Sequence, residues 1–66
     1  MAVARVTKIT AASPRGFQEA VNEGLARAAS TLHGITGLEV VSFKAKVDDG
    51  QISEYRVTIE VTFVLD

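Results

Sequence analysis

Almost perfect alternation of apolar and polar residues over positions 52–65 is the strongest pattern in the sequence. One alternate set is apolar or aromatic: Tyr55, Val57, Ile59, Val61, Phe63 and Leu65. The set between them is polar: Glu54, Arg56, Thr58, Glu60 and Thr62. A period of two predicts one β-strand with an apolar and a polar face. At about 3.3 Å per residue the strand would span roughly 46 Å, so we expect other copies of the chain to cover part of it.

Length and composition also favour self-association. A domain of 66 residues usually needs disulfide bonds, a metal or oligomerisation, and this chain contains no cysteine. Hydrophobic residues make up 47% of the chain, which is more than one small core can hide. We therefore expect residues 1–66 to form a single domain that is stabilised by oligomerisation.

Charge and hydropathy exclude two classes of partner. The formal net charge is −1, and no cluster of Lys and Arg offers a surface for nucleic acid. No apolar run has the length of a membrane span, and residues 1–5 lack the apolar core of a signal peptide. We expect no nucleic-acid partner, no membrane partner and a cytoplasmic location.

The first half of the chain predicts a strand followed by a helix. Residues 2–10 are rich in β-branched side chains and predict the strand. Ser13 suits a helix N-cap and Pro14 the first helical position, while His33 and Gly34 suit the helix end. Such a helix would be roughly 27 Å long. Apolar residues recur within it at spacings of three and four: Phe17, Ala20, Val21, Leu25, Ala28 and Leu32.

A second strand is predicted at residues 38–47. Its apolar residues change parity midway, which indicates a β-bulge near Val41 and Ser42 or a strand that is apolar on both faces. Residues 48–51 predict a turn in which Gly50 adopts a positive φ, so the last two strands form a hairpin. The predicted order is β-α-β-β, in the α+β class.

The sequence offers no catalytic machinery. His33 is the one imidazole, its predicted place is a helix end, and no spacing of serine, histidine and acid suggests a triad. The glycines match no phosphate-binding pattern. We therefore predict that the protein is not an enzyme.

Two groups of charged residues are candidates for binding. In the predicted hairpin Glu39 opposes Glu60, and such a pair repels unless a cation or a basic side chain intervenes. The pair can ligate a hard divalent ion such as calcium, or a base from a neighbour can neutralise it. Arg56, with Lys44 and Lys46 nearby, forms either a solvated face or a pocket between subunits for an anionic or heteroaromatic ligand.

The run from Gly37 to Val41, the Ser13-Pro14 pair and the ending from Tyr55 to Phe63 resemble the dodecin family over essentially the whole chain. The resemblance implies a three-stranded antiparallel sheet partly wrapped around one helix, and a homododecamer that forms a hollow sphere. Flavin-binding dodecins hold riboflavin or FMN between subunits and are thought to store or sequester it.

The same resemblance implies a ligand site near Thr36, Gly37, Lys44 and Arg56. This chain has Gly37 where flavin-binding dodecins stack the ring on a Trp, and Arg56 where they use a Gln. Loss of the stacking residue implies weaker flavin binding and resembles the calcium-binding branch of the family. Lys44 lies at a basic position of the kind that holds coenzyme A in some relatives. The sequence thus predicts a shell that binds a small ligand, flavin by family default, or alternatively a structural or calcium-binding shell without flavin.

Overall fold

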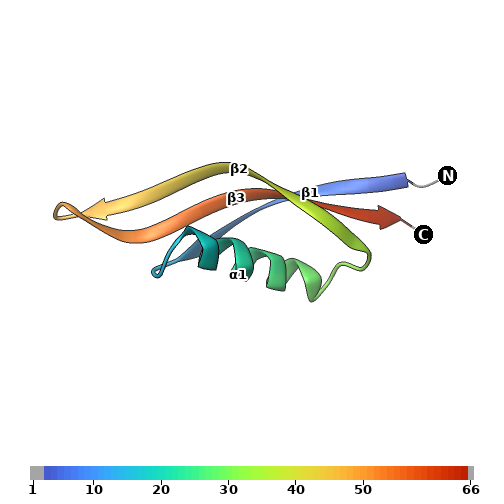
Figure 1. The fold of residues 1–66 in the computed structure, drawn as a ribbon, viewed down its shortest axis with the longest axis horizontal. Coiled ribbons are helices and arrows are strands. Elements are labelled where there is room, and N and C mark those ends of the chain that lie inside the picture. The colour runs from blue at the N-terminus through green and yellow to red at the C-terminus, as the bar shows by residue number, and fades with distance from the viewer. Residues whose placement is uncertain (1–2, 66) are drawn as a thin grey trace.

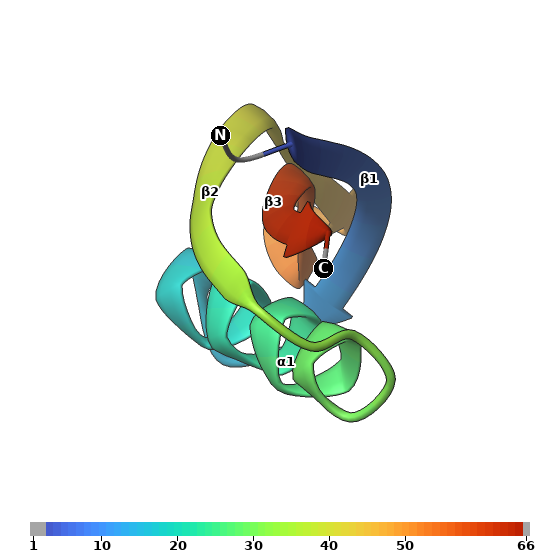
Figure 2. The same cartoon turned by 90° about the vertical axis from the view of Figure 1, so that its right-hand side faces the viewer.

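The structure is a computed structural model that describes residues 3–65. It consists of a three-stranded antiparallel sheet with one helix on one face. The elements are β1 (Val3–Ser13), α1 (Phe17–Ala29), β2 (Ile35–Asp48) and β3 (Gln51–Leu65) (Figure 1). The predicted β-α-β-β order is confirmed, although Ala2, the predicted start of the first strand, lies outside the described residues. β3 lies between β1 and β2, with α1 against one face (Figure 2).

The core lies between the centre of β3 and the helix. Val57, Ile59 and Val61 of β3 are buried, as the alternation predicted. Residues with little or no side chain, Ala20, Gly24 and Ala28, form the stripe of α1 that faces them. These small residues let the helix axis approach the sheet closely, and the large side chains of β3 fill the interface.

The helix begins later than predicted. Ser13 is not its N-cap but the last residue of β1, where it pairs with Tyr55 and is 1% exposed. Its hydroxyl oxygen accepts a hydrogen bond from the backbone N–H of Arg15 at 3.1 Å, so it stabilises the turn after the strand. Gly16 takes the N-cap position and Phe17 is the first helical residue. The prediction was wrong because the pairing of β1 with β3, a long-range contact, uses the residue that local propensity assigned to the helix.

The helix also ends earlier than predicted, at Ala29 rather than at His33. Ser30 is the C-cap, and its hydroxyl donates a hydrogen bond to the carbonyl of Arg27 at 2.7 Å. Gly34 does have the predicted positive φ, +73°, but it leads into β2, where its carbonyl accepts a hydrogen bond from Val64 N–H. The 13 residues of α1 give a length of about 20 Å, shorter than the predicted 27 Å.

We expect Gly34→Ala to destabilise the fold more than Gly50→Ala, although both residues have positive φ values, +73° and +75°. The left-handed conformation costs an L-residue about 1–2 kcal/mol at either position. At Gly34 the new Cβ would also lie 3.1 Å from the carbonyl oxygen of Val64, whereas at Gly50 it meets nothing within 4 Å. Crowding should add about 1 kcal/mol for Gly34→Ala alone. Urea unfolding at one fixed protein concentration measures the difference, and equal losses would contradict this account.

The predicted bulge in β2 is confirmed. The register shifts between Val40 and Ser42, which leaves Val41 as an extra residue. The shift lets Val40, opposite Ile59, and Phe43, opposite Val57, both face the helix although their numbers differ in parity. β2 is longer than predicted, and its pairing with β3 has two further register shifts that the sequence did not reveal, at Ile35/Gly37 and Lys46/Val47. The predicted turn at residues 48–51 is confirmed, because residues 48 and 51 pair, residues 49 and 50 connect them, and Gly50 has a positive φ.

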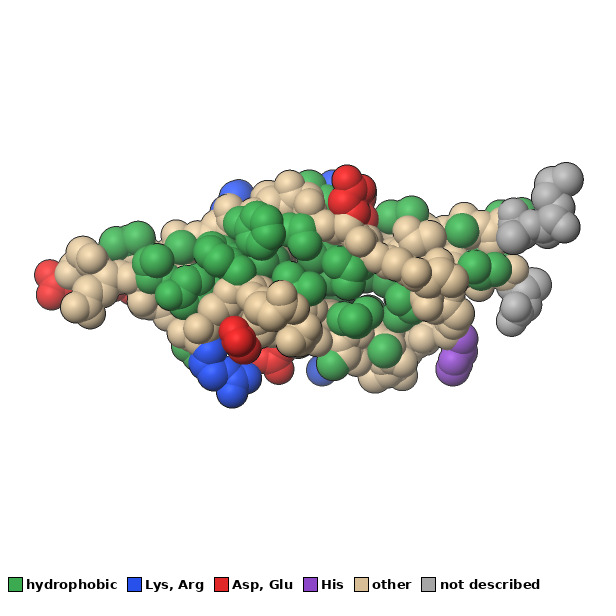
Figure 3. Space-filling view, in the orientation of Figure 1, with side chains coloured by type: hydrophobic (Ala, Val, Ile, Leu, Met, Phe, Trp, Pro, Cys, Tyr) green, Lys and Arg blue, Asp and Glu red, His purple; other side chains and the backbone are tan. Residues whose placement is uncertain are grey.

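The sheet extends well beyond its helix at both ends. The protein measures 52 × 19 × 13 Å, and the β2–β3 hairpin continues past both α1 and the end of β1 (Figure 1). Val47 and Ile52 near the hairpin end are 60% and 50% exposed, and Val3 and Leu65 at the opposite end are 61% and 46% exposed. A band of hydrophobic side chains reaches from the centre of the molecule to the hairpin, whose end is acidic (Figure 3). The expected overhang is therefore present and apolar.

Candidate functional site

The face of the sheet that points away from α1, here called the open face, carries the candidate binding residues. Because β3 is central, the open-face residues of its middle part each lie between a residue of β1 and one of β2. Three successive cross-strand rows differ in chemistry. The acidic row is Lys8, Glu60 and Glu39; the hydroxyl row is Thr10, Thr58 and Ser42; the basic row is Ala12, Arg56 and Lys44.

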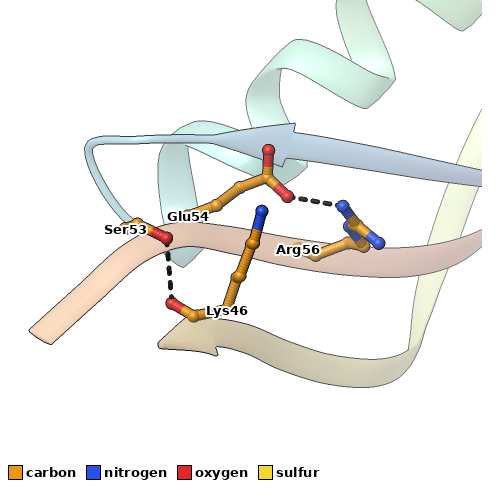
Figure 4. A network of polar contacts seen from close by, with 4 residues as sticks. All are labelled: Lys46, Ser53, Glu54 and Arg56. Atoms are coloured by element: carbon orange, nitrogen blue, oxygen red, sulfur yellow. Dashed lines mark hydrogen bonds and ion pairs between the residues drawn. The ribbon is translucent and has the colours of Figure 1, made fainter. Parts of the chain in front are cut away.

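The basic row brings together two of the predicted ligand residues. Lys44 lies directly opposite Arg56, rather than Phe43 as an unbulged hairpin would give. With Ala45 and Lys46 these residues line a hollow of about 170 Å³. The guanidinium of Arg56 donates a hydrogen bond to Glu54, and this pair is the one ion pair found in residues 3–65 (Figure 4). The hollow thus has three cations against one carboxylate, which favours an anionic ligand.

Neighbouring contacts hold the hairpin backbone beside this hollow. Ser53 is the extra residue at the third register shift, and its hydroxyl donates a hydrogen bond to the carbonyl of Lys46 at 3.3 Å (Figure 4). Next along the open face, the hydroxyls of Thr10 and Thr58 are 3.1 Å apart and share a hydrogen bond. The strand positions of Lys44 and Arg56 are therefore fixed by the sheet, while their side-chain ends remain in solvent.

The other two predicted ligand residues lie elsewhere. Gly37 is opposite Thr62, which is six residues along β3 from Arg56 and so about 20 Å away. Thr36 beside it is the unpaired residue of a register shift, and both residues are exposed. A Cβ at Gly37 would meet nothing within 4 Å, so the space beside it is open. One protomer does not surround a ligand with all four residues; a shared site needs a second copy.

The acidic row has the predicted pairing and one member that the sequence did not reveal. Glu39 is directly opposite Glu60, and Lys8 is opposite Glu60 on the other side. Lys8 supplies the basic side chain that such a pair requires. Its role depends on the register of β1 against β3, which joins the two ends of the chain and has no local signal. Two carboxylates supply at most four of the six to eight oxygens that calcium takes, and residues 3–65 contain no group of three or more metal-binding side chains.

The remaining candidate, His33, lies exposed in the connector between α1 and β2 and outside the three rows. Its predicted role at the helix end is wrong, since α1 ends four residues before it. Within residues 3–65 no helix is both long and apolar enough to cross a membrane.

Comparison with known proteins gives consistent results. The Dodecin family model matches residues 3–66. The dodecin of Thermus thermophilus is 30% identical over 64 residues, which cover 97% of this chain and 93% of the relative. The solved structure of the dodecin from Streptomyces davaonensis is 42% identical, with a TM-score of 0.93 over 98% of this chain and 96% of that one.

A third relative differs in its ligand. The structure of a calcium-chelating immunodominant antigen of Mycobacterium tuberculosis, named calcium dodecin and described as having a novel calcium-binding site, is 31% identical, with a TM-score of 0.83. It covers 97% of this chain and 91% of that one. The fold, the family match over nearly the whole sequence and the identity of these relatives agree, so this chain belongs to the dodecin family.

Proposed function

We propose that this protein is a non-catalytic cytoplasmic shell, a homododecamer that binds a small planar anion between subunits, with FMN as the first candidate. The observation that carries the proposal is the basic row, where Lys44 and Arg56 lie opposite each other on a face that the helix does not cover. Their distance from Gly37 supports a site that is completed by a second copy.

The residues have different roles in this proposal. The guanidinium of Arg56 is planar and can stack on a ring or donate paired hydrogen bonds to it. Lys44 and Lys46 act as point charges for a phosphate group. Thr36 and Gly37 of another copy border the ring, and the missing side chain at Gly37 leaves one ring face without an aromatic partner. The affinity should therefore depend more on charge than on stacking.

Titration with FMN and with riboflavin, followed by flavin fluorescence, tests the proposal. FMN should bind more tightly than riboflavin, because only FMN carries the phosphate. Lys44→Ala should reduce this preference, while Lys8→Ala, which removes a cation from the same face outside the basic row, should leave it unchanged. No quenching by either flavin at tens of micromolar would remove flavin as the ligand.

The acidic row supports a second candidate, a divalent-cation shell with calcium held by Glu39 and Glu60. Their direct opposition favours this candidate, and Lys8 beside them opposes it. Thermal unfolding with calcium and with EDTA distinguishes the calcium shell from the flavin-binding shell. A melting temperature that does not respond to either addition would count against the calcium shell and leave the flavin proposal intact.

We expect Lys8→Met to raise calcium affinity about fivefold, because it removes one positive charge next to Glu60 while keeping an apolar side chain of similar length. A unit charge a few ångströms away near a protein surface corresponds to about 1 kcal/mol after solvent screening. Calorimetric titration measures the change. Lys44→Met, which removes a cation from the same face of the sheet but in the basic row, is the matched control. An equal gain in calcium affinity from both variants would show that only net charge matters.

A further inference from the structure

The guanidinium of Arg56, which the proposed ligand site requires, is already paired with a carboxylate of its own strand. Its Nη2 donates a hydrogen bond to Oε1 of Glu54, two residues earlier in β3 and therefore on the same open face (Figure 4). Glu54 is not among the residues that line the hollow, so it reaches Arg56 from the side. This carboxylate occupies one of the contacts that an anionic ligand would use.

The sheet leaves Arg56 few other partners. Its cross-strand neighbour in β2 is Lys44, which has the same charge, and its neighbour in β1 is Ala12, which offers only a methyl group. Like charges directly opposite each other repel. Glu54 offsets this repulsion from within the chain, and a bound anion between Lys44 and Arg56 would offset it from outside. The carboxylate and the ligand therefore compete for the same cation.

Glu54 can exchange Arg56 for another partner. The ion pair is exposed, with 52% of the Arg56 side chain and 35% of the Glu54 side chain accessible, and exposed ion pairs are weak. β1 ends at Ser13, opposite Tyr55, so within the described sheet β1 contributes no residue beside Glu54. Lys46 lies directly opposite Glu54 in β2 and can balance its charge when Arg56 binds another anion. The exchange therefore requires only rotation of side chains.

The edge and the flat faces of the guanidinium differ in what they bind. The edge carries the N–H donors, one of which Glu54 uses, whereas the flat faces stack on planar rings. A neutral ring can therefore stack on Arg56 while Glu54 keeps its hydrogen bond. A phosphate group uses the edge and the positive charge, and Glu54 already uses both. The carboxylate thus opposes the binding of anions but not of neutral rings.

We propose that Glu54 is a specificity-determining residue of the basic row, an internal competitor that lowers the affinity for phosphate-bearing ligands. The affinity for neutral planar ligands does not depend on it. The inference rests on the proposed ligand site and deepens it, because Glu54 limits how strongly that site prefers FMN over riboflavin. A phosphate ligand held in this way exchanges more readily than one bound by three unopposed cations.

Glu54→Gln tests the proposal, because it removes the charge and keeps the shape of the side chain. The affinity for FMN should rise about fivefold, the upper value for one exposed charge pair, and the affinity for riboflavin should not change. Glu23→Gln is the matched control for net charge, since it removes an exposed carboxylate from α1, on the other face of the sheet. It should change neither affinity. Flavin fluorescence titration of the three proteins at one ionic strength measures both.

Three results would overturn the competition. Equal losses of FMN and riboflavin affinity in Glu54→Gln would mean that Glu54 positions Arg56 for the ligand. Equal gains of FMN affinity in Glu54→Gln and Glu23→Gln would attribute the effect to net charge. Unchanged affinity for FMN in Glu54→Gln would mean that its phosphate does not use the charge of Arg56.

A probe without a flavin ring separates this inference from the flavin proposal. Inorganic phosphate, compared with chloride at equal ionic strength, should raise the melting temperature of Glu54→Gln more than that of the unmodified protein, because a ligand stabilises the state that binds it. If neither flavin binds and this difference is present, the flavin proposal fails and the competition stands. If flavin binds and the difference is absent, the competition alone fails. If neither flavin binds and the difference is absent, both fail.

Discussion

Ile59→Ala is expected to lower the free energy of unfolding by about 2–5 kcal/mol, the largest effect of any single substitution considered for this protein. Ile59 is 0% exposed and lies at the centre of the central strand, with Ile9 on one side and Val40 on the other. A Cβ built on Gly24 would lie 3.2 Å from its Cδ1, so the helix packs directly on this side chain. Truncation leaves a cavity that the surrounding sheet cannot collapse to fill.

Urea unfolding at fixed protein concentration measures this loss, since the proposed oligomerisation would make apparent stability depend on concentration. Ile59→Val, which removes a single methylene, should cost only about 0.5–1.5 kcal/mol. A truncation at exposed Val41 should cost less still. Similar losses for Ile59→Ala and Val41→Ala would mean that the core does not lie between β3 and α1.

Gly37→Trp is expected to increase the affinity for FMN and riboflavin by about tenfold. The position tolerates a side chain, because a Cβ would meet nothing within 4 Å and the φ of Gly37 is not in the left-handed region. A Trp there would supply the aromatic stacking surface that the proposed site lacks at this position. An aromatic pair contributes about 0.5–1.5 kcal/mol beyond area burial, and 1.4 kcal/mol corresponds to tenfold in affinity.

Gly37→Leu is the matched control for this substitution, because it adds apolar area without a ring. Fluorescence titration of the three proteins separates burial from stacking. Equal gains from Leu and Trp would attribute the effect to burial alone. No gain from either would place the flavin away from residue 37, and the proposed site would then be wrong at that position.

The hairpin and its bulge could be predicted because their signals are local. The alternation from Tyr55 to Leu65 predicted the strand β3 and its apolar face, though not its central place, and the parity change after Val40 indicated the bulge as one of two alternatives. The opposition of Glu39 and Glu60 was predicted from the turn, and it holds because the extra residues Ser53 in β3 and Val41 in β2 offset each other. These inferences use residues that are close in sequence, where periodicity and turn chemistry determine the arrangement.

Two of the features that the sequence did not predict correctly depend on the pairing of β1 with β3. Ser13 has the composition of a helix cap, but the long-range ladder incorporates it in a strand, and the helix begins at Phe17 instead. Lys8 could not be assigned to the acidic row for the same reason, since nothing near it in sequence reports that Glu60 is its neighbour. The partner of Arg56 changed from Phe43 to Lys44 because Ser53, the extra residue of β3 near the turn, shifts the register by one residue.

The three irregularities of the β2–β3 pairing have a consequence for the size of any closed particle. Each adds local twist and bends the ribbon, so the strand's residues set a radius as well as a pairing pattern. Deleting Val41 would leave neighbouring side chains on their present faces but straighten the strand. Subunits with a flatter sheet would close around a larger central cavity or would not form a closed shell. In the proposed shell, the number of copies would thus depend partly on one extra residue, Val41, which is not among the proposed ligand residues.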